Sequence, residues 1–337
     1  MDDTVDDTVD GTVDGTVDGT GEMDFRVLGP VELLDRRTGT YAAPSGAKQR
    51  ALLGALVVRA GQVLPAERLI HELWGDRPPA SAANALHAHV ARLRRLLRRA
   101  AGEDGISTRA TGYTLGRPAA RTDAHRFQDL SSKGRGTLAA DPVRAAELLG
   151  DALALWRGPA LAGSGQGPLC AREAERLEEL RLTTLETLYE ARLRSGRHAE
   201  AARELERLTA RHPVRERLYD LLMLALYRCG RQAEALGVYE RARRRLVDEL
   251  GVEPGPALRG RMEAILHHAP SLSVPDPDAT LHELGGAIAR LGVRIEALAR
   301  EQQELIRRLD GLTSGVTGQG PPVEGGHLLE QGADVEG

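Results

Sequence analysis

Cysteine is scarce in this sequence, and long apolar runs are missing. Cys170 and Cys229 are the two cysteines in 337 residues, and they lie far apart without a C-x-x-C spacing. A disulfide framework or a zinc site is therefore not expected, and buried free thiols in a reducing cytosol fit better. No apolar stretch reaches the roughly 18 residues of a membrane span, and the first residues have no basic and apolar segments of a secretory signal. These absences predict a cytoplasmic protein.

The motifs of common enzyme classes are missing too. The sequence has no G-x-x-x-x-G-K-[ST] loop, no G-x-G-x-x-G after a strand, no H-E-x-x-H and no G-x-S-x-G. His267 and His268 form an isolated pair without carboxylates or thiols at ligand spacing, so a surface pair is expected there rather than a metal site. We predict no catalytic residue, no metal and no cofactor, and we expect that the protein is not an enzyme.

Lysine is nearly absent, and charge is distributed unevenly. Only two of the 45 basic residues are lysine, which together with abundant Ala and Gly points to a GC-rich bacterial genome. Residues 23–120 hold 15 Lys and Arg against eight Asp and Glu, a net charge of +7, whereas residues 1–22 hold eight acidic residues and no basic one. A basic domain beside near-neutral helices fits one module that binds DNA and one that does not.

Residues 1–22 are an acidic repeat in which T-V-D recurs every four residues. Without large apolar groups this segment cannot bury a core, so we predict that it is disordered. Met23 precedes the first stretch with folding signals and is a candidate start of the functional protein. An inert tail and an autoinhibitory tail that competes with DNA are the alternatives.

The segment from Pro78 to Leu115 predicts a helix followed by a β-hairpin. At 100° per residue, Leu86, Val90, Leu93 and Leu97 fall within about 60° of each other and form a buried stripe. The opposite side carries Asn84, Ala88, Ala91 and Arg95, flanked by Arg92, Arg98 and Arg99. Small residues allow a close approach to base edges, and Asn and Arg supply donors for bases and phosphates. A solvated surface helix is the alternative.

The neighbouring residues complete a winged helix-turn-helix domain. Phe25–Leu34 alternates around Gly29-Pro30 and predicts two short strands, and a third strand is expected near Thr40–Ala43. Helices are expected over Lys48–Arg59, with Ser45 as N-cap, and over Ala66–Trp74. In the hairpin, Gly112 suits a tight turn and Arg109 is expected near the tip of the wing.

Helical periodicity continues through six segments after Leu115, over residues 123–139, 142–156, 169–195, 197–211, 215–229 and 231–250. Ser195-Gly-Arg-His-Ala-Glu-Ala aligns with Cys229-Gly-Arg-Gln-Ala-Glu-Ala at an offset of 34 residues, which is the period of tetratricopeptide helix pairs. An ordinary helical bundle with a chance similarity is the alternative. Stacked helix pairs form a concave face suited to a protein or ligand partner.

The C-terminal region predicts a linker over 269–280, a short coiled coil over 281–310 and a disordered tail over 311–337. Leucines recur every seven residues, with Ile288, Ile295, Gln302 and Leu309 between them, a pattern that favours a parallel two-stranded coil. Fewer than four heptads are marginal, so a helix folded back onto the helical repeats is the alternative. The residues predicted to mediate dimerisation are Leu284, Ile288, Leu291, Ile295, Leu298 and Leu305.

Both halves of the chain resemble the Streptomyces antibiotic regulatory proteins, which join an OmpR-type winged helix to a bacterial transcriptional activation domain. The first half carries F-R-V-L-G-P-V-E, K-Q-R-A-L-L-G-A-L, R-L-I-H-E-L-W-G-D-R-P-P-A-S-A-A-N-A-L-H-A-H-V-A-R-L-R-R-L-L and T-R-A-T-G-Y-T-L. The second half carries A-L-A-L-W-R-G-P-A-L and residues 222–258. The resemblance covers about Phe25 to His268. It implies a mostly α fold with a small β component, with a winged helix over 23–120, an all-α tetratricopeptide-like domain over 121–268 and a C-terminal helix.

The resemblance also implies a pathway-specific activator that binds direct repeats near the −35 region of promoter DNA and recruits RNA polymerase. The loop Gly75, Asp76, Arg77, Pro78 and Pro79 is where this fold meets polymerase. Arg92, Arg94 and Arg109 are the implied DNA contacts, and His89 and Ser107 are implied backbone contacts. The complete predicted DNA-binding set is Asn84, His89, Arg92, Arg94, Arg95, Arg98, Ser107, Arg109, Lys48 and Arg50.

A nucleoid-associated activator without a membrane partner is the leading hypothesis. A tetratricopeptide-type scaffold or signalling adaptor whose winged helix does not bind DNA is the alternative. Salt-dependent binding to promoter DNA separates the two.

Overall fold

The computed structural model describes residues 23–35, 37–102, 105–116, 120–164, 167–273 and 277–316. The predicted disordered segment at 1–22 lies outside the described residues, and so do residues 317–337 of the predicted disordered tail. Residues 311–316 of that tail are wrongly predicted, because they belong to the last helix of the chain. The described part divides into two units, one ending at Val274 and one beginning at Pro275. Each unit is described by itself. No described helix in either unit is long and apolar enough to cross a membrane.

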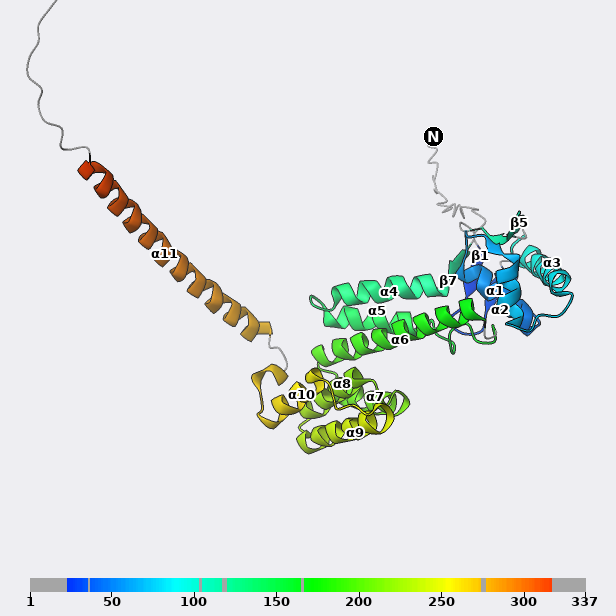
Figure 1. Cartoon of the computed structure of the whole chain (residues 1–337). Helices are drawn as coiled ribbons and strands as arrows, with labels where there is room; N and C mark the ends of the chain where they lie inside the picture. Colours follow the sequence, from blue (N-terminus) through cyan, green and yellow to red (C-terminus); the bar gives the residue numbers. More distant parts are fainter. Residues whose placement is uncertain are drawn as a thin grey trace, which may run out of the picture. The chain divides into compact units, whose positions relative to one another are not determined.

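Two small sheets and three helices form the winged-helix part of the first unit (Figure 1). Strands β1 (Met23–Arg26), β2 (Glu32–Asp35), β3 (Thr40–Ala42) and β7 (Ala120–Thr122) form one sheet in the order β3-β2-β1-β7, in which β1 and β7 run parallel. Strands β4 (Leu64–Pro65), β5 (Ile106–Arg109) and β6 (Gly112–Leu115) form the other sheet in the order β4-β6-β5. The helices are α1 (Ala47–Val58), α2 (Ala66–Trp74) and α3 (Ala82–Ala101).

The predicted helices and the hairpin are confirmed, while β4 and β7 were missed. Both missed strands are two or three residues long, and their hydrogen-bond partners are distant in the sequence. No local sequence pattern therefore predicts them. Ser45 was wrong as a cap, because the N-cap of α1 is Gly46 and no side chain caps this helix.

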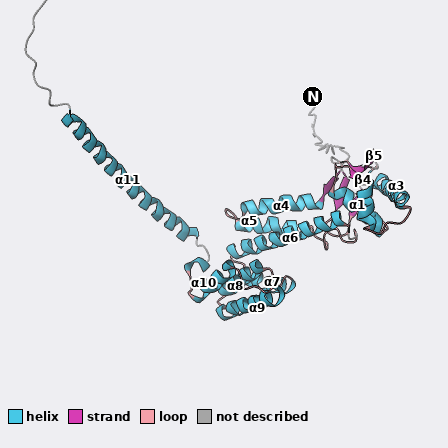
Figure 2. Ribbon diagram, in the orientation of Figure 1, coloured by secondary structure: helices cyan, strands magenta, loops and turns pink. Residues whose placement is uncertain are grey.

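The rest of the first unit is helical, as predicted, although its last helix was not among the six helical segments expected from the sequence (Figure 2). The elements are α4 (Asp123–Thr137), α5 (Pro142–Ala154), α6 (Pro168–Arg194), α7 (His198–Arg211), α8 (Glu216–Arg228), α9 (Gln232–Leu250) and α10 (Pro256–Leu266). Gly196 and Gly230 hold equivalent turns between α6 and α7 and between α8 and α9, with φ of 81° and 75°. Because a residue with a side chain is strained at such φ values, glycine recurs at the 34-residue offset.

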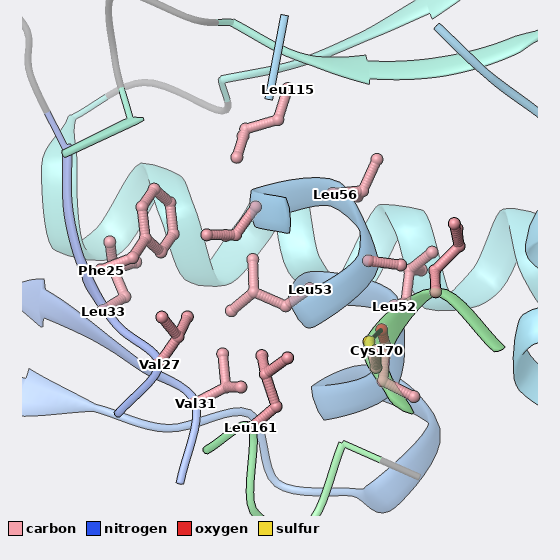
Figure 3. Close-up of a cluster of buried hydrophobic side chains, with 14 of the residues drawn as sticks. Phe25, Val27, Val31, Leu33, Leu52, Leu53, Leu56, Leu115, Leu161 and Cys170 are labelled. Atoms are coloured by element: carbon pink, nitrogen blue, oxygen red, sulfur yellow. Dashed lines mark hydrogen bonds between the residues drawn. The ribbon is translucent and has the colours of Figure 1, made fainter. Parts of the chain in front are cut away.

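One hydrophobic core runs from the winged helix into helices α4, α5 and α6. The cluster that holds Phe25 and Leu53 also contains Leu161 and Cys170 (Figure 3). Residues 157–162 add backbone bonds to the segment between β1 and β2, from Leu161 N to Val27 O at 2.8 Å and from Ala162 N to Gly29 O at 3.0 Å. The predicted boundary at 120/121 lies inside strand β7, which pairs with β1, and the buried core continues across it.

A second core joins the C-terminal half of α6 to α7–α10 and includes Leu272. The predicted linker over 269–280 therefore needs correction at both ends. Pro270–Leu272 forms a 3₁₀ turn, and Arg228 donates to the carbonyl oxygens of Leu272 and Ser273 at 2.9 and 3.1 Å. Helix α11 (Pro277–Val316) begins at its other end and, with 40 residues, is longer than the predicted coil.

Candidate nucleic-acid interface

Helix α3 has one apolar face and one polar face, which is the arrangement that its sequence predicts. Leu86, Val90, Leu93 and Leu97 are at most 2% exposed. The opposite face is exposed and carries Asn84, His87, Ala88, Ala91, Arg92, Arg95, Arg98 and Arg99. Among the described residues, no hydrogen bond or ion pair is found for Arg92 or Arg95. Because α3 has no acidic residue, its exposed face offers positive charge and hydrogen-bond donors to a polyanion.

Arg94 lies on the flank of α3 that faces the wing. Its Nε donates to the carbonyl oxygen of Ile106 at 2.9 Å, and its Nη2 donates to Thr108 Oγ1 at 2.9 Å. This guanidinium group therefore joins α3 to strand β5. Contact of Arg94 with DNA stays a prediction, while its donors already serve to hold the wing against α3.

His89 lies on the other flank of α3, where its ring centroid is 6.1 Å from that of Trp74 in α2. Its Nδ1 is buried and has no hydrogen-bond partner among the described residues. Burial, with the charges of Arg92 and Lys48, lowers the pKa of His89 below its usual value. A ring packed against tryptophan fits a role between two helices, and a contact with a phosphate stays a prediction.

The wing consists of β5 and β6 joined by a turn at Ala110 and Thr111. Arg109 is paired with Gly112 at the last rung before the turn and is exposed, as is Ser107. Gly112 is needed for a different reason than the predicted one. A Cβ atom at this position would lie 1.9 Å from the carbonyl oxygen of Leu64, so glycine allows β4 to pair with β6.

Lys48 and Arg50 of α1 are both engaged in bonds within the protein. Lys48 Nζ donates to the carbonyl oxygen of Leu73 at the end of α2. Arg50 Nε donates to the carbonyl oxygen of Gly163 at 3.2 Å, and its Nη1 donates to that of Pro44 at 3.2 Å. The sequence prediction that these residues bind DNA gains no support from their positions, because their donors point to neighbouring segments of the chain.

The loop between α2 and α3 displays all five residues predicted to contact polymerase. Gly75, Asp76, Arg77, Pro78 and Pro79 are exposed. Gly75 ends α2 with a φ of 61°, which favours glycine and turns the chain away from the helix axis.

Glu72, in the last turn of α2, was missed by sequence reasoning and links the winged helix to helix α6. The side chain is 3% exposed, and its carboxylate accepts from Leu169 N at 2.8 Å and from Cys170 N at 2.9 Å. These are free donors in the first turn of α6, where a negative charge is favoured. Gly167 makes room for this contact, because a Cβ atom there would lie 2.3 Å from the carboxylate. No local signal identifies Glu72, since its partners lie about a hundred residues away.

The arrangement offers positive charge and hydrogen-bond donors to a binding partner. α3 presents a basic, exposed face, the wing presents Arg109 beside it, and α2 and the wing hold the two flanks of the helix. Within the described ranges, no group of three His, Cys, Asp or Glu side chains could hold a metal ion.

Family models match both parts of the first unit. Residues 43–115 match the model described as transcriptional regulatory protein, C terminal, and residues 122–266 match that of the bacterial transcriptional activator domain. The first match therefore ends with β6, and the second begins directly before α4.

Regulators from Streptomyces are similar over most of the chain. The transcriptional regulator RedD of Streptomyces coelicolor is 43% identical over 259 residues, which cover 76% of this chain and 73% of RedD. The regulatory protein DnrI of Streptomyces peucetius is 38% identical over 268 residues, covering 76% of this chain and 96% of DnrI.

A solved structure gives the same result for the fold. Mycobacterium tuberculosis EmbR, in complex with a low-affinity phosphopeptide, matches with a TM-score of 0.68 and 33% identity over 80% of this chain and 71% of EmbR. The chain therefore belongs to the Streptomyces antibiotic regulatory protein family of transcriptional activators, which combine an OmpR-type winged helix with a bacterial transcriptional activator domain.

Proposed function

We propose that this protein binds direct repeats near the −35 region of the promoters of a secondary-metabolite gene cluster and recruits RNA polymerase there. It acts at the nucleoid in the cytoplasm as a binding protein without catalytic chemistry. The observation that carries the proposal is the exposed face of α3, which holds four arginines and no acidic residue, beside the exposed Arg109 of the wing. A helix in the major groove and a wing on the neighbouring backbone account for both features.

DNA binding is tested by mobility shifts with promoter DNA at several salt concentrations. For about six phosphate contacts, the log of the binding constant should fall with the log of the salt concentration with a slope near −5. Arg92→Ala and Arg109→Ala should each cost about 1–3 kcal/mol of specific binding. Arg203→Ala, an exposed position in α7, is the matched control. Unchanged affinity of both variants for the same operator would overturn the assignment of these residues.

Polymerase recruitment is assigned to the exposed α2–α3 loop, next to the buried contact of Glu72 with α6. The variant with Asp76→Ala and Arg77→Ala should retain its affinity for the operator and lose activation of transcription in vitro. Activation at the level of the unchanged protein would remove the loop from the proposal.

Homodimerisation through α11 belongs to the same proposal. Tethering two DNA-binding units raises the effective concentration of the second unit at its half-site. Deletion of residues 281–337 should therefore weaken binding to a double site and leave binding to a single half-site unchanged. Equal affinity of the deleted and full chains for the double site would contradict this role.

A further inference from the structure

Helix α11 exposes an apolar stripe along its described length. Ile288, Leu291, Ile295, Leu298 and Leu305 are between 56% and 65% exposed. They follow the alternating spacing of three and four residues that brings side chains to one side of a helix, with the leucines at d and the isoleucines at a. In the sequence, Leu281, Leu284, Leu309 and Leu312 continue this spacing at both ends. An exposed apolar stripe of this length indicates that a second helix packs along it.

The charged residues beside the stripe distinguish the two directions in which a second copy could pair. In the g positions, α11 carries Arg294 and Glu301, both exposed, and the sequence places Arg308 at the next g position. In a parallel pair each g residue faces the e position five residues later in the partner. Arg294 would then face Ala299 and Glu301 would face Ile306, so no opposite charges would meet.

An antiparallel pair gives complementary contacts. If Ile295 packs against Leu298 of the second chain, Ile288 packs against Leu305 and the apolar stripe stays in register over 281–312. In an antiparallel coil the g positions of the two helices face each other, so Arg294 of each chain meets Glu301 of the other. We propose that two copies of this chain pair through α11 as an antiparallel coiled coil in this register.

The polar residue in the stripe is accommodated by the same arrangement. Gln302 packs opposite Leu291 of the second chain, with Gly292 and Ala299 beside that layer. These small side chains leave a path from the Gln302 amide to water, which limits the penalty of burying it. The a and d positions alone favour a parallel pair, which would place Gln302 against itself. That pair would leave Arg294 and Glu301 without opposite charges.

A second copy is the occupant because the pattern is complementary to itself. Arg294 followed by Glu301 becomes Glu followed by Arg when the helix is reversed. The inference rests on the dimer in the proposed function and is independent of DNA binding, so both parts can fail separately.

Cysteine crosslinking in the full chain tests the direction. Cys229→Ser removes the accessible native thiol, while Cys170 is buried. Ile288→Cys and Leu305→Cys are then made in separate chains and oxidised alone or as an equimolar mixture. The mixture should form disulfide-linked dimers and neither variant should do so alone, because residues 288 of the two helices would be about 25 Å apart.

Efficient crosslinking of Ile288→Cys alone would establish the parallel pair and overturn the proposal. A dimer by light scattering that does not crosslink in the mixture would contradict the register. If light scattering finds a monomer at tens of micromolar, two copies do not pair. That result would also be expected if α11 folds back onto its own chain, and it would refute the proposal. Loss of DNA binding with intact crosslinking would affect only the proposed function.

A charge swap provides an independent test. Arg294→Glu changes two attractive contacts into two repulsive ones and should weaken the dimer about tenfold at low salt. Adding Glu301→Arg should restore dimerisation, because the exchanged charges pair again. Arg290→Glu, an exposed position away from the stripe, is the matched control. An unchanged dimer with Arg294→Glu, or no rescue by the double variant, would contradict the antiparallel pair.

Discussion

Helices α3 and α11 carry similar apolar stripes that meet different environments. In α3 the side chains of Leu86, Val90, Leu93 and Leu97 are at most 2% exposed, whereas those of Ile288, Leu291, Ile295 and Leu298 in α11 are 59% to 65% exposed. The stripe of α3 packs against α1, α2 and β2 of its own unit. Periodicity thus shows which side of a helix is apolar, and tertiary structure shows whether other elements of the same unit bury it.

The polar faces of the two helices differ in charge. The outer face of α3 has four exposed arginines and no carboxylate, so its positive charge is left for a partner. α11 carries both signs, and Arg307 lies 3.6 Å from Glu304 within the helix. The difference separates a helix that faces a polyanion from one that faces a helix of its own kind.

Truncation of a leucine in each stripe should give the largest contrast. Leu93→Ala removes a fully buried side chain and should lower the free energy of unfolding of the first unit by about 3 kcal/mol. Leu298→Ala should leave that unit unchanged and weaken self-association. Denaturant unfolding and light scattering measure the two effects. Equal destabilisation of the first unit by both changes would remove the distinction between the stripes.

The second largest effect concerns the contact between Glu72 of the winged helix and the first turn of α6 in the activator domain. Glu72→Ala leaves the amides of Leu169 and Cys170 without their acceptor and should cost about 2 kcal/mol of stability. Glu67→Ala, an exposed position in the same helix, is the control and should change stability by about 0.5 kcal/mol or less. Similar unfolding midpoints of the two variants would mean that the contact is not stabilising.

Arginines on different sides of α3 should separate stability from binding. Arg94→Ala removes two hydrogen bonds to β5 and should cost about 1 kcal/mol of stability, with increased hydrogen exchange in the wing. Arg98→Ala, on the exposed face, should reduce DNA affinity without changing the unfolding midpoint. Loss of affinity with Arg94→Ala at unchanged stability and exchange would assign Arg94 to the DNA surface instead.

The smallest expected effect is a pH dependence from the buried flank of α3. Burial lowers the pKa of His89, so the unfolded chain binds a proton more readily than the folded chain. Stability should therefore fall as the pH decreases below about 6.5, the usual histidine value. His89→Phe should reduce the drop in melting temperature between pH 7.5 and 5.5 by about one degree. An identical drop in both proteins would show that other groups control it.

The helices could be predicted because their signals are local. The stripe of α3, the hairpin and the repeated glycines at 196 and 230 follow from the period of apolar residues and from backbone preference. The exposed positions of Asn84, Arg92 and Arg95 follow from the same helical geometry. The arginines and lysine that bind within the protein could not be separated from those left exposed, because Lys48, Arg50 and Arg94 find carbonyl or hydroxyl acceptors on other segments.

The sequence by itself determined the main helices and the hairpin, the basic face of α3 and the heptads of α11, because each depends on residues within one helical turn or one rung of a hairpin. Tertiary structure alone decided that β7 pairs with β1, that the core of the winged helix continues into α6, and that Glu72 binds the first turn of that helix. These features join residues that are distant in the chain. Their energy comes from excluding water and satisfying buried donors at one place in space, which no local pattern records.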